Sequence, residues 1–507
     1  MSLGEPHVKR LLISLSIALG AMPAALLAAT AYVATPLGSI GGTTTYGTGV
    51  NASGSVGGFG DTTGAGASSR RAFLFTSSIL NLGTLNGGTQ SFGEAINDQG
   101  DIAGLSNAGG AAAFHAVIFR GGAIVDLNSI LGGASSTAYG INNAGDVVGG
   151  VTSTGGQRAY IYRGTTNTAT TLGTFGGTTS QAYAINVFGE AAGYAHVPSS
   201  DAHAFRYDSG GLVDLGTLGG PASIGYGINA AGHVVGMAGV NGASSHAFLH
   251  DGTAMIDLGT LGGTESKASA INSADVVVGE AADGTGTLRA FVYVNGTMTD
   301  LNTVTTGLGG FALSTATAIN DAGQIVAMSC TGPLVCPRAF RLDPAPAAKV
   351  AAIEYHHAAF DHYFSTAIAD EITKLDNGTF AGWSRTGASF NVYTADQVGT
   401  SPVCRFFSTA FAPKSSHFYT PYAAECVTVQ RNPDWQFEGR VYNIGLPDAN
   451  GNCPAGTDPV YRLYNNGQGN APNHRFTTSL ATRATMLAQG WVPEGSGPNA
   501  VAMCAPQ

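Results

Sequence analysis

A chain of 507 residues with a net charge of −10 shows no clustered basic surface that could neutralise phosphates, so we expect no nucleic-acid partner. Because 44% of its residues are hydrophobic and only 11% are charged, the composition also excludes a disordered polymer. The 74 glycines, set among regularly spaced Val, Ile, Leu and Phe, instead indicate many short strands separated by turns.

The N-terminal 31 residues have the pattern of an export signal. Lys9 and Arg10 precede the apolar run Leu11 to Leu27, and Ala29-Thr30-Ala31 offers the small residues of a cleavage site. A membrane anchor is the alternative, but the run is short for a spanning helix and no later run is long enough. We expect a mature protein without a transmembrane segment that is secreted or at the cell surface, with the periplasm as a further option.

A repeated unit of about 45 residues fills residues 32–342. Its most regular anchor is an asparagine ahead of a turn, and successive anchors lie 43 to 48 residues apart. The anchors are Asn51, Asn97, Asn142, Asn186, Asn229, Asn272 and Asn320. Each unit holds four candidate strands, as a propeller blade does. The sequence therefore predicts a mainly β protein built on a seven-bladed β-propeller.

The first two strands of a unit are joined by Asn-x-x-Gly, as in Asn142-Asn-Ala-Gly145. Asn at the first place can bond its own backbone, and Gly at the fourth accepts a positive φ. Asp275 replaces the glycine in one unit, which is tolerable because Asp also adopts that conformation. The last two strands are joined by turns such as Asp251-Gly252 and Asn295-Gly296, both strong hairpin signals.

A basic residue recurs at the start of the third strand, and in four units an acid follows eleven residues later. If Asp251-Gly252 forms a two-residue turn, His246 faces Asp257 across the ladder. The other pairs are His115 with Asp126, His203 with Asp214, and Arg289 with Asp300. The alternative is a cationic ring that binds an anion, which the recurring acids disfavour. That ring would consist of Arg71, His115, Arg158, His203, His246, Arg289 and Arg338.

The two ends of the array complement each other. It opens with Tyr32 to Ile40, which matches the fourth strand of a unit, and it stops after Arg338 to Leu342, which matches the third. We therefore expect the N-terminal strand to complete the last blade, because closure of the ring removes an exposed strand edge.

The array also resembles a known family. The triplets His203-Ala-Phe205 and His246-Ala-Phe248, together with Leu-Gly-Thr-Leu-Gly-Gly at 215–220 and 258–263, are similar to the HAF repeats of predicted extracellular bacterial proteins. The resemblance covers residues 36–342, although several units carry Arg in place of His. It implies no established activity.

A linker, residues 343–349, leads to a region of different composition, residues 350–507. Three segments there repeat at intervals of 55 and 57 residues, and a tryptophan follows each. They are His362-Tyr-Phe-Ser365, His417-Phe-Tyr-Thr420 and His474-Arg-Phe-Thr477. Each unit reads strand, strand, short helix, strand, which predicts a three-repeat α+β domain with Ser365, Thr420 and Thr477 as helix N-caps.

These units, especially Val460 to Asn465, Asn473 to Thr478 and Gly490 to Gly495, resemble the DUF5648 repeat. That domain is often attached to exported bacterial hydrolases and surface proteins. The resemblance implies an accessory role such as carbohydrate binding, and it identifies no ligand residue.

All six cysteines lie late in the chain. An even number in an exported protein indicates disulfides, although six cysteines allow fifteen connectivities. We predict that neighbours pair: Cys330 with Cys336, Cys404 with Cys426, and Cys453 with Cys504. Zinc binding is the alternative, but no C-x-x-C spacing supports it.

The C-terminal aromatics are the candidate ligand-binding residues, because a ring stacks on the C–H face of a sugar while polar groups bond its hydroxyls. The candidates are Trp383, Trp435, Trp491, His362, His417 and His474. The alternative, which we favour, is that each Trp forms the core of its repeat.

A metal site at His356, His357, Asp361 and His362 is a further alternative. The equivalent pairs, Ser416-His417 and Asn473-His474, indicate a turn-and-strand pattern instead, so we expect no metal.

Catalytic signatures such as G-x-S-x-G, H-E-x-x-H and G-x-x-x-x-G-K are missing, so catalytic residues stay unknown and no cofactor is expected. We predict an exported, non-catalytic protein that recognises glycan or cell-envelope material through its C-terminal domain. One alternative is a propeller-based polysaccharide hydrolase or lyase, with acids and His or Tyr from several blades meeting at one channel mouth. The other is an architectural surface protein.

Overall fold

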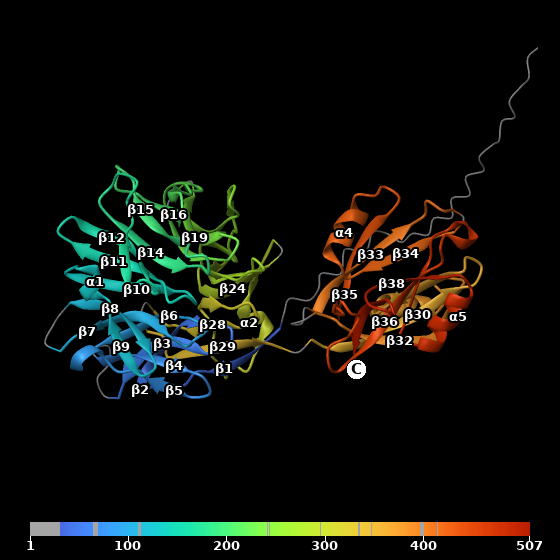
Figure 1. Ribbon diagram of the computed structural model, residues 1–507, viewed down its shortest axis with the longest axis horizontal. Helices are drawn as coiled ribbons and strands as arrows, with labels where there is room; N and C mark the ends of the chain where they lie inside the picture. The colour runs from blue at the N-terminus through green and yellow to red at the C-terminus, as the bar shows by residue number, and fades with distance from the viewer. Residues whose placement is uncertain are drawn as a thin grey trace, which may run out of the picture. The chain divides into compact units, whose positions relative to one another are not determined.

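The computed structural model describes residues 31–63, 69–109, 113–240, 242, 244–294, 296–332, 335–345, 347–395, 400–412 and 414–507. The chain divides into two compact units, Ala31–Ala345 and Pro346–Gln507 (Figure 1). Apart from Ala31, the predicted export signal lies outside the described residues. Among the helices that are described, none has the length and hydrophobicity needed to cross a membrane.

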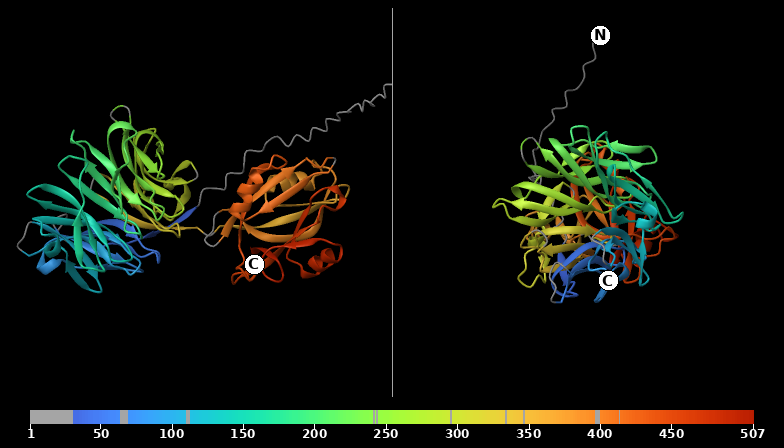
Figure 2. Two further views of the ribbon diagram at one scale, coloured as in Figure 1. Left: turned by 45° about the horizontal axis from the view of Figure 1, so that its top comes forward. Right: turned by 90° about the vertical axis from the view of Figure 1, so that its left-hand side faces the viewer.

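The first unit is a seven-bladed β-propeller, which confirms the prediction from the repeats. Six blades are four-stranded antiparallel sheets in chain order, and the seventh blade has five strands in the part of the chain described. The first strands of successive blades contact one another in a closed circle, so they form the innermost layer (Figure 2). These strands are β2 (Gly41–Val50), β6 (Ser91–Ile96), β10 (Ser135–Ile141), β14 (Ser180–Ile185), β18 (Gly219–Ile228), β22 (Gly262–Ile271) and β27 (Thr315–Ile319).

Three further layers surround the innermost strands. The second strands are β3 (Val56–Thr62), β7 (Ile102–Asn107), β11 (Val147–Ser153), β15 (Ala191–His196), β19 (Val234–Val240), β23 (Val277–Asp283) and β28 (Ile325–Ser329). The third strands are β4 (Arg70–Phe75), β8 (Phe114–Arg120), β12 (Gly156–Arg163), β16 (Ala202–Asp208), β20 (Ser245–His250), β24 (Leu288–Val294) and β29 (Arg338–Pro344). The outer strands are β5 (Ile79–Asn81), β9 (Ala123–Asp126), β13 (Thr168–Thr171), β17 (Gly211–Asp214), β21 (Met255–Asp257), β25 (Thr297–Asp300) and β1 (Tyr32–Pro36). Three short helices join blades: η2 (Leu85–Gly87), α1 (Asn128–Leu131) and α2 (Leu301–Val304).

The N-terminal strand closes the ring, as predicted. β1 pairs antiparallel with β29, with Tyr32 opposite Pro344 and Pro36 opposite Phe340. Tyr32 is 4% exposed, and it packs in the cluster that the last two blades share. A short strand that was not predicted, β26 (Thr305–Thr306), pairs parallel with the other edge of β1. The first strand therefore lies between two segments nearly 300 residues away in the chain.

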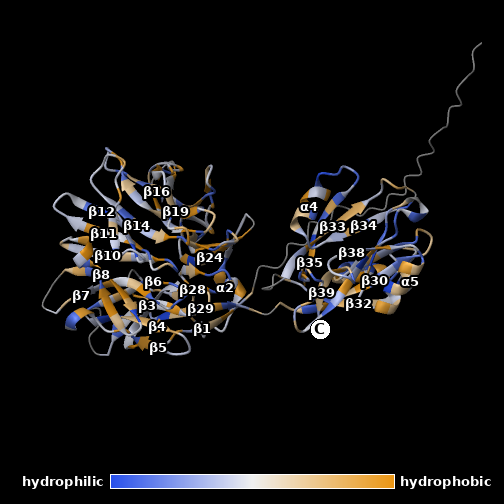
Figure 3. Cartoon of the chain, viewed as in Figure 1, coloured by the Kyte–Doolittle hydropathy of each residue, from blue (hydrophilic) through white to orange (hydrophobic). Residues whose placement is uncertain are grey.

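The buried part of each His-Ala-Phe triplet explains why the triplet repeats. Ala204, Phe205, Ala247 and Phe248 are fully buried between blades. The amide of Ala204 donates to the hydroxyl of Ser223 in the next blade, at 2.8 Å. Small and aromatic residues at these places thus fill the space between sheets, and the hydropathy colouring shows hydrophobic residues along the strands of the unit (Figure 3).

The hairpin prediction at Asp251-Gly252 was wrong in its length. The strands pair His250 with Met255, so four residues form the loop. The carboxylate of Asp251 accepts from the amides of Thr253 and Ala254, each at 2.9 Å, and this bonding holds the wider loop. At the other predicted hairpin, Val294 pairs with Thr297, as the prediction requires, while Asn295 itself lies outside the described residues.

The second unit has three repeats of strand, strand, helix and strand, as predicted. The first contains β30 (Lys349–His357), β31 (His362–Thr366), α3 (Ala369–Asp376) and β32 (Trp383–Tyr393). The second contains β33 (Thr400–Ser408), β34 (Ser416–Thr420), α4 (Ala423–Gln430) and β35 (Gln436–Gly445). The third contains β36 (Thr457–Tyr464), η3 (Gln468–Asn470), β37 (His474–Thr477), α5 (Leu480–Ala488) and β38 (Val492–Glu494), and β39 (Val501–Pro506) ends the chain. β31, β34 and β37 contact one another.

The helix N-caps are not the predicted residues. The helices begin after Ile368, Tyr422 and Ser479. Thr420 and Thr477 end their strands, and each accepts from the amide two residues later, at 3.1 Å. These hydroxyls therefore stabilise the turn that leads into the helix, and their residues lie two positions before the helix N-cap.

The three predicted disulfides are all present: Cys330–Cys336, Cys404–Cys426 and Cys453–Cys504. Cys404 and Cys426 join β33 to α4 beside Phe406 and Phe418. Three disulfides suggest an oxidising, extracellular environment, because thiols in the cytosol are kept reduced.

Buried ion pairs tie the three repeats of the second unit together. Arg405 in the second repeat bonds Glu371 in the first at 2.7 Å, and both side chains are 6% exposed. In the same way Arg462 of the third repeat bonds Glu425 of the second at 3.0 Å. Arg405 and Arg462 lie on the first strands of their repeats, whereas the first strand of the first repeat carries a buried acid, Glu354.

Arg475 of the third repeat supplies the cation for Glu354, at 2.9 Å. The link between the third and first repeats is therefore also an ion pair, with its signs exchanged.

Candidate functional site

Seven asparagines form a closed ring of hydrogen bonds at one end of the propeller. Each anchor asparagine follows the innermost strand of its blade, is buried, and donates from Nδ2 to the carbonyl of the next anchor. The bonds run from Asn51 to Asn97 (3.0 Å), Asn97 to Asn142 (3.3 Å), Asn142 to Asn186 (3.1 Å), Asn186 to Asn229 (2.9 Å), Asn229 to Asn272 (3.1 Å), Asn272 to Asn320 (3.3 Å) and Asn320 to Asn51 (2.8 Å). This second role of the anchor was not predicted.

The turn-forming role of the anchor is confirmed. Oδ1 of Asn142 accepts from the amides of Ala144 and Asp146, each at 3.0 Å, and Gly145 has a φ of +76°. Asp275, the exception, has a φ of +58° and keeps the turn. One side chain therefore both shapes its own turn and bonds the next blade.

Every innermost strand has a β-bulge three residues before its anchor. The bulged residues are Thr48, Glu94, Tyr139, Tyr183, Tyr226, Ser269 and Thr317. All seven are half-buried. The hydroxyls of Thr48 and Thr317 donate to the carbonyls of Gly93 and Gly47 on the next innermost strand, at 2.9 and 2.8 Å. We infer that the bulged side chains line the wall of the central channel.

The channel wall is asymmetric. Glu94, Tyr139, Tyr183 and Tyr226 occupy four consecutive blades and form what we name the large arc. The small arc consists of Thr48, Ser269 and Thr317. Because small side chains face large ones across the ring, the channel has more room beside the small arc than it would have if all seven blades carried the same large side chain.

The three tyrosines of the large arc are in contact. The ring centroids of Tyr139 and Tyr183 are 5.2 Å apart, and those of Tyr183 and Tyr226 are also 5.2 Å apart. Burial raises the pKa of each phenol above its usual value, so all three carry their protons at neutral pH. Among the described residues, the hydroxyls of Tyr183 and Tyr226 have no hydrogen-bond partner. They are free to bond a ligand.

Charged groups stand at both ends of the tyrosine row. Beyond Tyr226, Nζ of Lys267 lies 5.8 Å from that ring's centroid and 2.8 Å from Glu280. Beyond Tyr139 stands Glu94, and burial raises the pKa of its carboxyl to about 8. The row therefore runs from a carboxyl that is neutral at pH 7 to an ion pair.

The histidine–aspartate pairs are confirmed, although their register is not. Nδ1 of His246 lies 2.9 Å from the Asp257 carboxylate, while the ladder places Asp257 opposite Phe248. His115–Asp126 and His203–Asp214 repeat the contact at 2.9 Å. In all three pairs the aspartate lies opposite the residue two positions after the histidine, so the side chains meet diagonally. The four-residue loop accounts for this offset at Asp257, whereas the strands that carry Asp126 and Asp214 are joined by two-residue turns.

The predicted pair Arg289–Asp300 is wrong. Arg289 bonds Asp283 at 3.0 Å, and Asp300 instead caps helix α2 by accepting from the amide of Asn302. Arg71, Arg158 and Arg338 donate to backbone carbonyls near them. Because each basic group has a partner of its own, the structure gives no support to a cationic ring.

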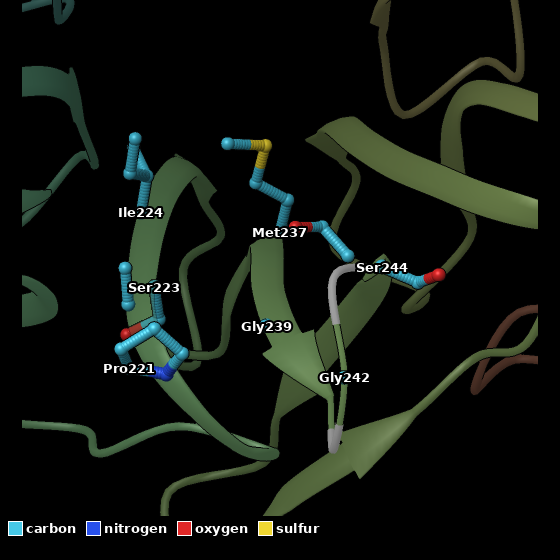
Figure 4. A pocket seen from close by; sticks show the side chains of 9 residues that line it. Pro221, Ser223, Ile224, Met237, Gly239, Gly242 and Ser244 are labelled. Atoms are coloured by element: carbon cyan, nitrogen blue, oxygen red, sulfur yellow. The ribbon is translucent and has the colours of Figure 1, made fainter.

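A small cavity of about 200 Å³ lies in the fifth blade (Figure 4). Pro221, Ile224 and Met237 line it together with serine and glycine residues, and none of the lining residues is charged. Pockets for small-molecule ligands usually enclose about 300 to 1,000 Å³. We therefore regard the channel wall, rather than this cavity, as the candidate site.

The three candidate histidines of the second unit are buried, and two of them, His362 and His417, are in contact. His362 is 1% exposed, while His417 and His474 are each 8% exposed. Nε2 of His362 accepts from the amide of His417 and lies 3.1 Å from its Nδ1. Burial, assisted by the neighbouring His417, lowers the pKa of His362 to about 2. His362 is therefore a neutral residue of the interior.

The candidate tryptophans pack in three separate clusters. Trp491 is 8% exposed and lies with Leu463 and Met486. Trp383 and Trp435 are half-buried against the neighbouring clusters and keep part of their surface accessible. The structure thus brings His362 and His417 together but leaves His474 and the tryptophans apart, and sugar binding by these six residues stays a prediction.

The proposed metal set is not assembled. Nε2 of His356 pairs with Asp361 at 3.1 Å, while His357 stacks on Phe360. Across the described residues, no three His, Cys, Asp or Glu side chains gather in a way that could hold a metal ion.

Residues 354–501 match the model of a family described as a domain of unknown function, DUF5648. This match supports the resemblance drawn for the C-terminal domain, while the likeness of the propeller to HAF repeats stays a prediction. No curated protein matches the chain.

Several solved structures are similar in fold. TolB from Acinetobacter baumannii is 12% identical with a TM-score of 0.34, and the match covers 49% of this chain and 61% of TolB. The β-propeller domain of the Trilobed protease from Pyrococcus furiosus is 8% identical with a TM-score of 0.38, over 60% of this chain and 94% of that domain. XC5397, a gluconolactonase from Xanthomonas campestris, is 10% identical with a TM-score of 0.32, over 64% of this chain and 94% of the enzyme. Such identities concern the fold alone.

Proposed function

We propose that this protein binds glycan in an extracellular compartment and that the large arc of the propeller channel is its binding surface. The observation that carries the proposal is the row Tyr139, Tyr183 and Tyr226, whose ring centroids are 5.2 Å apart, while the hydroxyls of Tyr183 and Tyr226 have no hydrogen-bond partner in the part of the chain that the structure describes. The three disulfides support the compartment.

A row of tyrosines suits a sugar chain for two reasons. The apolar C–H face of a sugar ring packs on an aromatic face, and the phenol at its edge bonds hydroxyls that the sugar brings. A row of adjacent rings offers stacking surface to more than one sugar unit, so we expect an oligosaccharide to bind better than a single sugar.

The small arc supports the same proposal. Thr48 and Thr317 hold their hydroxyls against the wall, so the side of the channel facing the tyrosines is occupied by short side chains. A ligand on the tyrosines therefore meets little steric hindrance from across the ring.

The C-terminal tryptophans are the second location for the same function. Trp383 and Trp435 keep accessible surface, whereas Trp491 and the three histidines are buried. We place the site on the tyrosines because they share one surface, while the tryptophans belong to three separate clusters.

The test is binding of the full mature chain to an array of neutral and acidic oligosaccharides, followed by titration calorimetry with the best binder. Tyr183→Ala removes the middle ring of the row and should weaken binding at least about tenfold, since it removes stacking and a hydrogen bond. Tyr183→Phe keeps the ring and should lose less.

Trp435→Ala is the matched control from the other unit, and it should bind as the wild-type chain does. Thermal unfolding shows whether each variant is folded. Loss of binding in Trp435→Ala with retention in Tyr183→Ala would move the site to the C-terminal domain, and binding to no glycan would overturn the proposal.

A further inference from the structure

Glu94 is the only acid among the seven bulged positions of the channel wall. The others are three tyrosines and three small hydroxyl residues. Its side chain is half-buried, and it has neither a hydrogen bond nor an ion pair among the described residues. Its carboxyl oxygens are not among the fully buried side-chain atoms that lack a partner, so they keep accessible surface on which a ligand could bond.

The neighbours of Glu94 explain why the wall does not satisfy it. On one side Thr48 donates to the carbonyl of Gly93, so the hydrogen of this hydroxyl is not available to Glu94. On the other side stands Tyr139, whose pKa is raised first by its own burial and then by the charge that Glu94 would carry. Of these two neighbours only Tyr139 titrates, and its pKa depends on the charge of Glu94.

The protonation state of Glu94 follows from its surroundings. Burial alone raises the pKa of its carboxyl to about 8, without a contribution from a neighbouring charge. At neutral pH the group is therefore a carboxylic acid, with one O–H that donates and a carbonyl oxygen that accepts. This pair of functions matches a sugar hydroxyl, which also donates and accepts.

We propose that Glu94 is a specificity-determining residue of the channel, which hydrogen-bonds the hydroxyls of an uncharged glycan stacked on Tyr139. The proposal rests on the proposed function and adds to it the class of ligand and the residue that selects it. An anionic glycan would be disfavoured at this end, because no charged neighbour among the described residues acts on this place and none would offset the desolvation of the anion.

The surroundings favour recognition over hydrolysis by two carboxyls. The two catalytic carboxyl groups of a glycosidase stand about 5 to 9.5 Å apart. Glu280, the acid at the other end of the row, lies beyond both Tyr183 and Tyr226 and is paired with Lys267 at 2.8 Å. Among the described residues, no neighbouring carboxylate contributes to the pKa shift of Glu94, so the structure offers no second ionised carboxyl for it to act with.

The experiment compares Glu94→Gln, Glu94→Ala and Glu265→Gln in the full mature chain. Glutamine keeps one donor and one acceptor but cannot ionise, alanine removes both, and Glu265 is an exposed glutamate on β22 that serves as the matched control. Titration calorimetry uses cello-, xylo-, manno- and malto-hexaose as neutral probes and oligogalacturonate and oligoalginate as anionic probes, at pH 6, 7, 8 and 9.5.

We expect a neutral probe to bind and the anionic probes not to bind. Affinity of the wild-type chain should fall about tenfold between pH 7 and pH 9.5, as Glu94 ionises and loses its donor. Glu94→Gln should bind nearly as well with no such fall, Glu94→Ala should bind about tenfold more weakly at pH 7, and Glu265→Gln should match the wild-type chain.

Failure of this inference can be told from failure of the proposed function. If Tyr183→Ala abolishes binding while Glu94→Ala binds as the wild-type chain does, the channel binds glycan and Glu94 does not select it. Equal binding of anionic and neutral probes, or a pH dependence retained in Glu94→Gln, overturns the inference in the same way. If no probe binds the wild-type chain, the proposed function fails together with it.

Discussion

Asn320 donates from Nδ2 to the carbonyl of Asn51, 2.8 Å away, and so links the last blade to the first. Its Oδ1 accepts from the amide of Gln324 at 2.9 Å in its own turn. Asn320→Asp keeps the acceptor and replaces the donor by an oxygen that faces a carbonyl. We expect it to lower the free energy of unfolding by about 1 to 3 kcal/mol, because a buried acceptor loses its partner and meets a like charge.

Urea unfolding followed by far-ultraviolet circular dichroism would measure this change. Phe188→Ala is the control, because Phe188 lies on an anchor turn of the same ring and is 74% exposed. Should Asn320→Asp unfold at the same urea concentration as the wild-type chain, the turn alone would account for the repeated asparagine.

Substitutions on the two faces of the closing strand, β1, should differ in their effect on the free energy of unfolding. Tyr32→Ala empties a place that is 4% exposed, whereas Val33→Ala, the next residue of β1, changes a side chain that is 45% exposed. We expect Tyr32→Ala to cost about 3 to 5 kcal/mol and Val33→Ala less than about 1 kcal/mol. Thermal unfolding of both variants would test this, and equal melting temperatures would contradict the packing described for Tyr32.

Loop length should order the effects of the disulfides. Cys404–Cys426 closes a separation of 22 residues, and Cys330–Cys336 closes one of 6. In the chain-entropy model the longer loop contributes about 3.4 kcal/mol and the shorter about 2.2 kcal/mol. Replacing each pair by alanine and measuring unfolding would test the order, and a larger loss for the shorter loop would contradict it.

Arg405 should be the most sensitive charge of the second unit. Arg405→Met leaves Glu371 and Glu438 buried without their cation, which we expect to cost about 3 to 5 kcal/mol. Arg385→Met breaks the pair with Asp376, in which the two side chains are 48% and 40% exposed, and should have a much smaller effect because solvent screens the pair. Tryptophan fluorescence reports this unit alone, because all three tryptophans lie in it. Similar losses in both variants would contradict the argument.

Glu438 should make the second unit sensitive to acid. Burial by itself would raise its pKa, but the hydrogen bond and charge of His417 and the charge of Arg405 lower the pKa to about 2. Because this value lies below the ordinary 4.5, the stabilisation is complete above about pH 4.5 and is lost as the pH falls towards 2. Glu438→Gln should flatten the fluorescence-detected acid transition, whereas exposed Asp434→Asn should not.

The repeats made the propeller predictable, because their period equals the length of a blade. The turn alone was enough to explain why the anchor asparagine repeats, so no feature of the sequence indicated that it also has a hydrogen-bond partner in the next blade. The register of His246 was missed for a related reason, since the Asp251 carboxylate holds a longer loop than the Asp-Gly pair suggests.

The candidate site on the channel wall was not predicted, because the residue type at the bulged position differs from blade to blade. The bulged position holds Thr, Glu, Tyr or Ser, so it forms no motif, whereas the tryptophans repeat visibly and attracted the prediction. Aligning the seven units on the anchor and reading three residues upstream would have found Tyr139, Tyr183 and Tyr226. Only the inward position of those strands, a property of the closed ring, shows that they share a surface.

The pairing of β1 with β29 also imposes an order on biosynthesis. The first strand of the propeller cannot find its neighbour until residue 344 has been made, so a nascent chain must carry an unpaired segment through most of its synthesis. The ring can therefore close only after the strands of the six other blades have been synthesised.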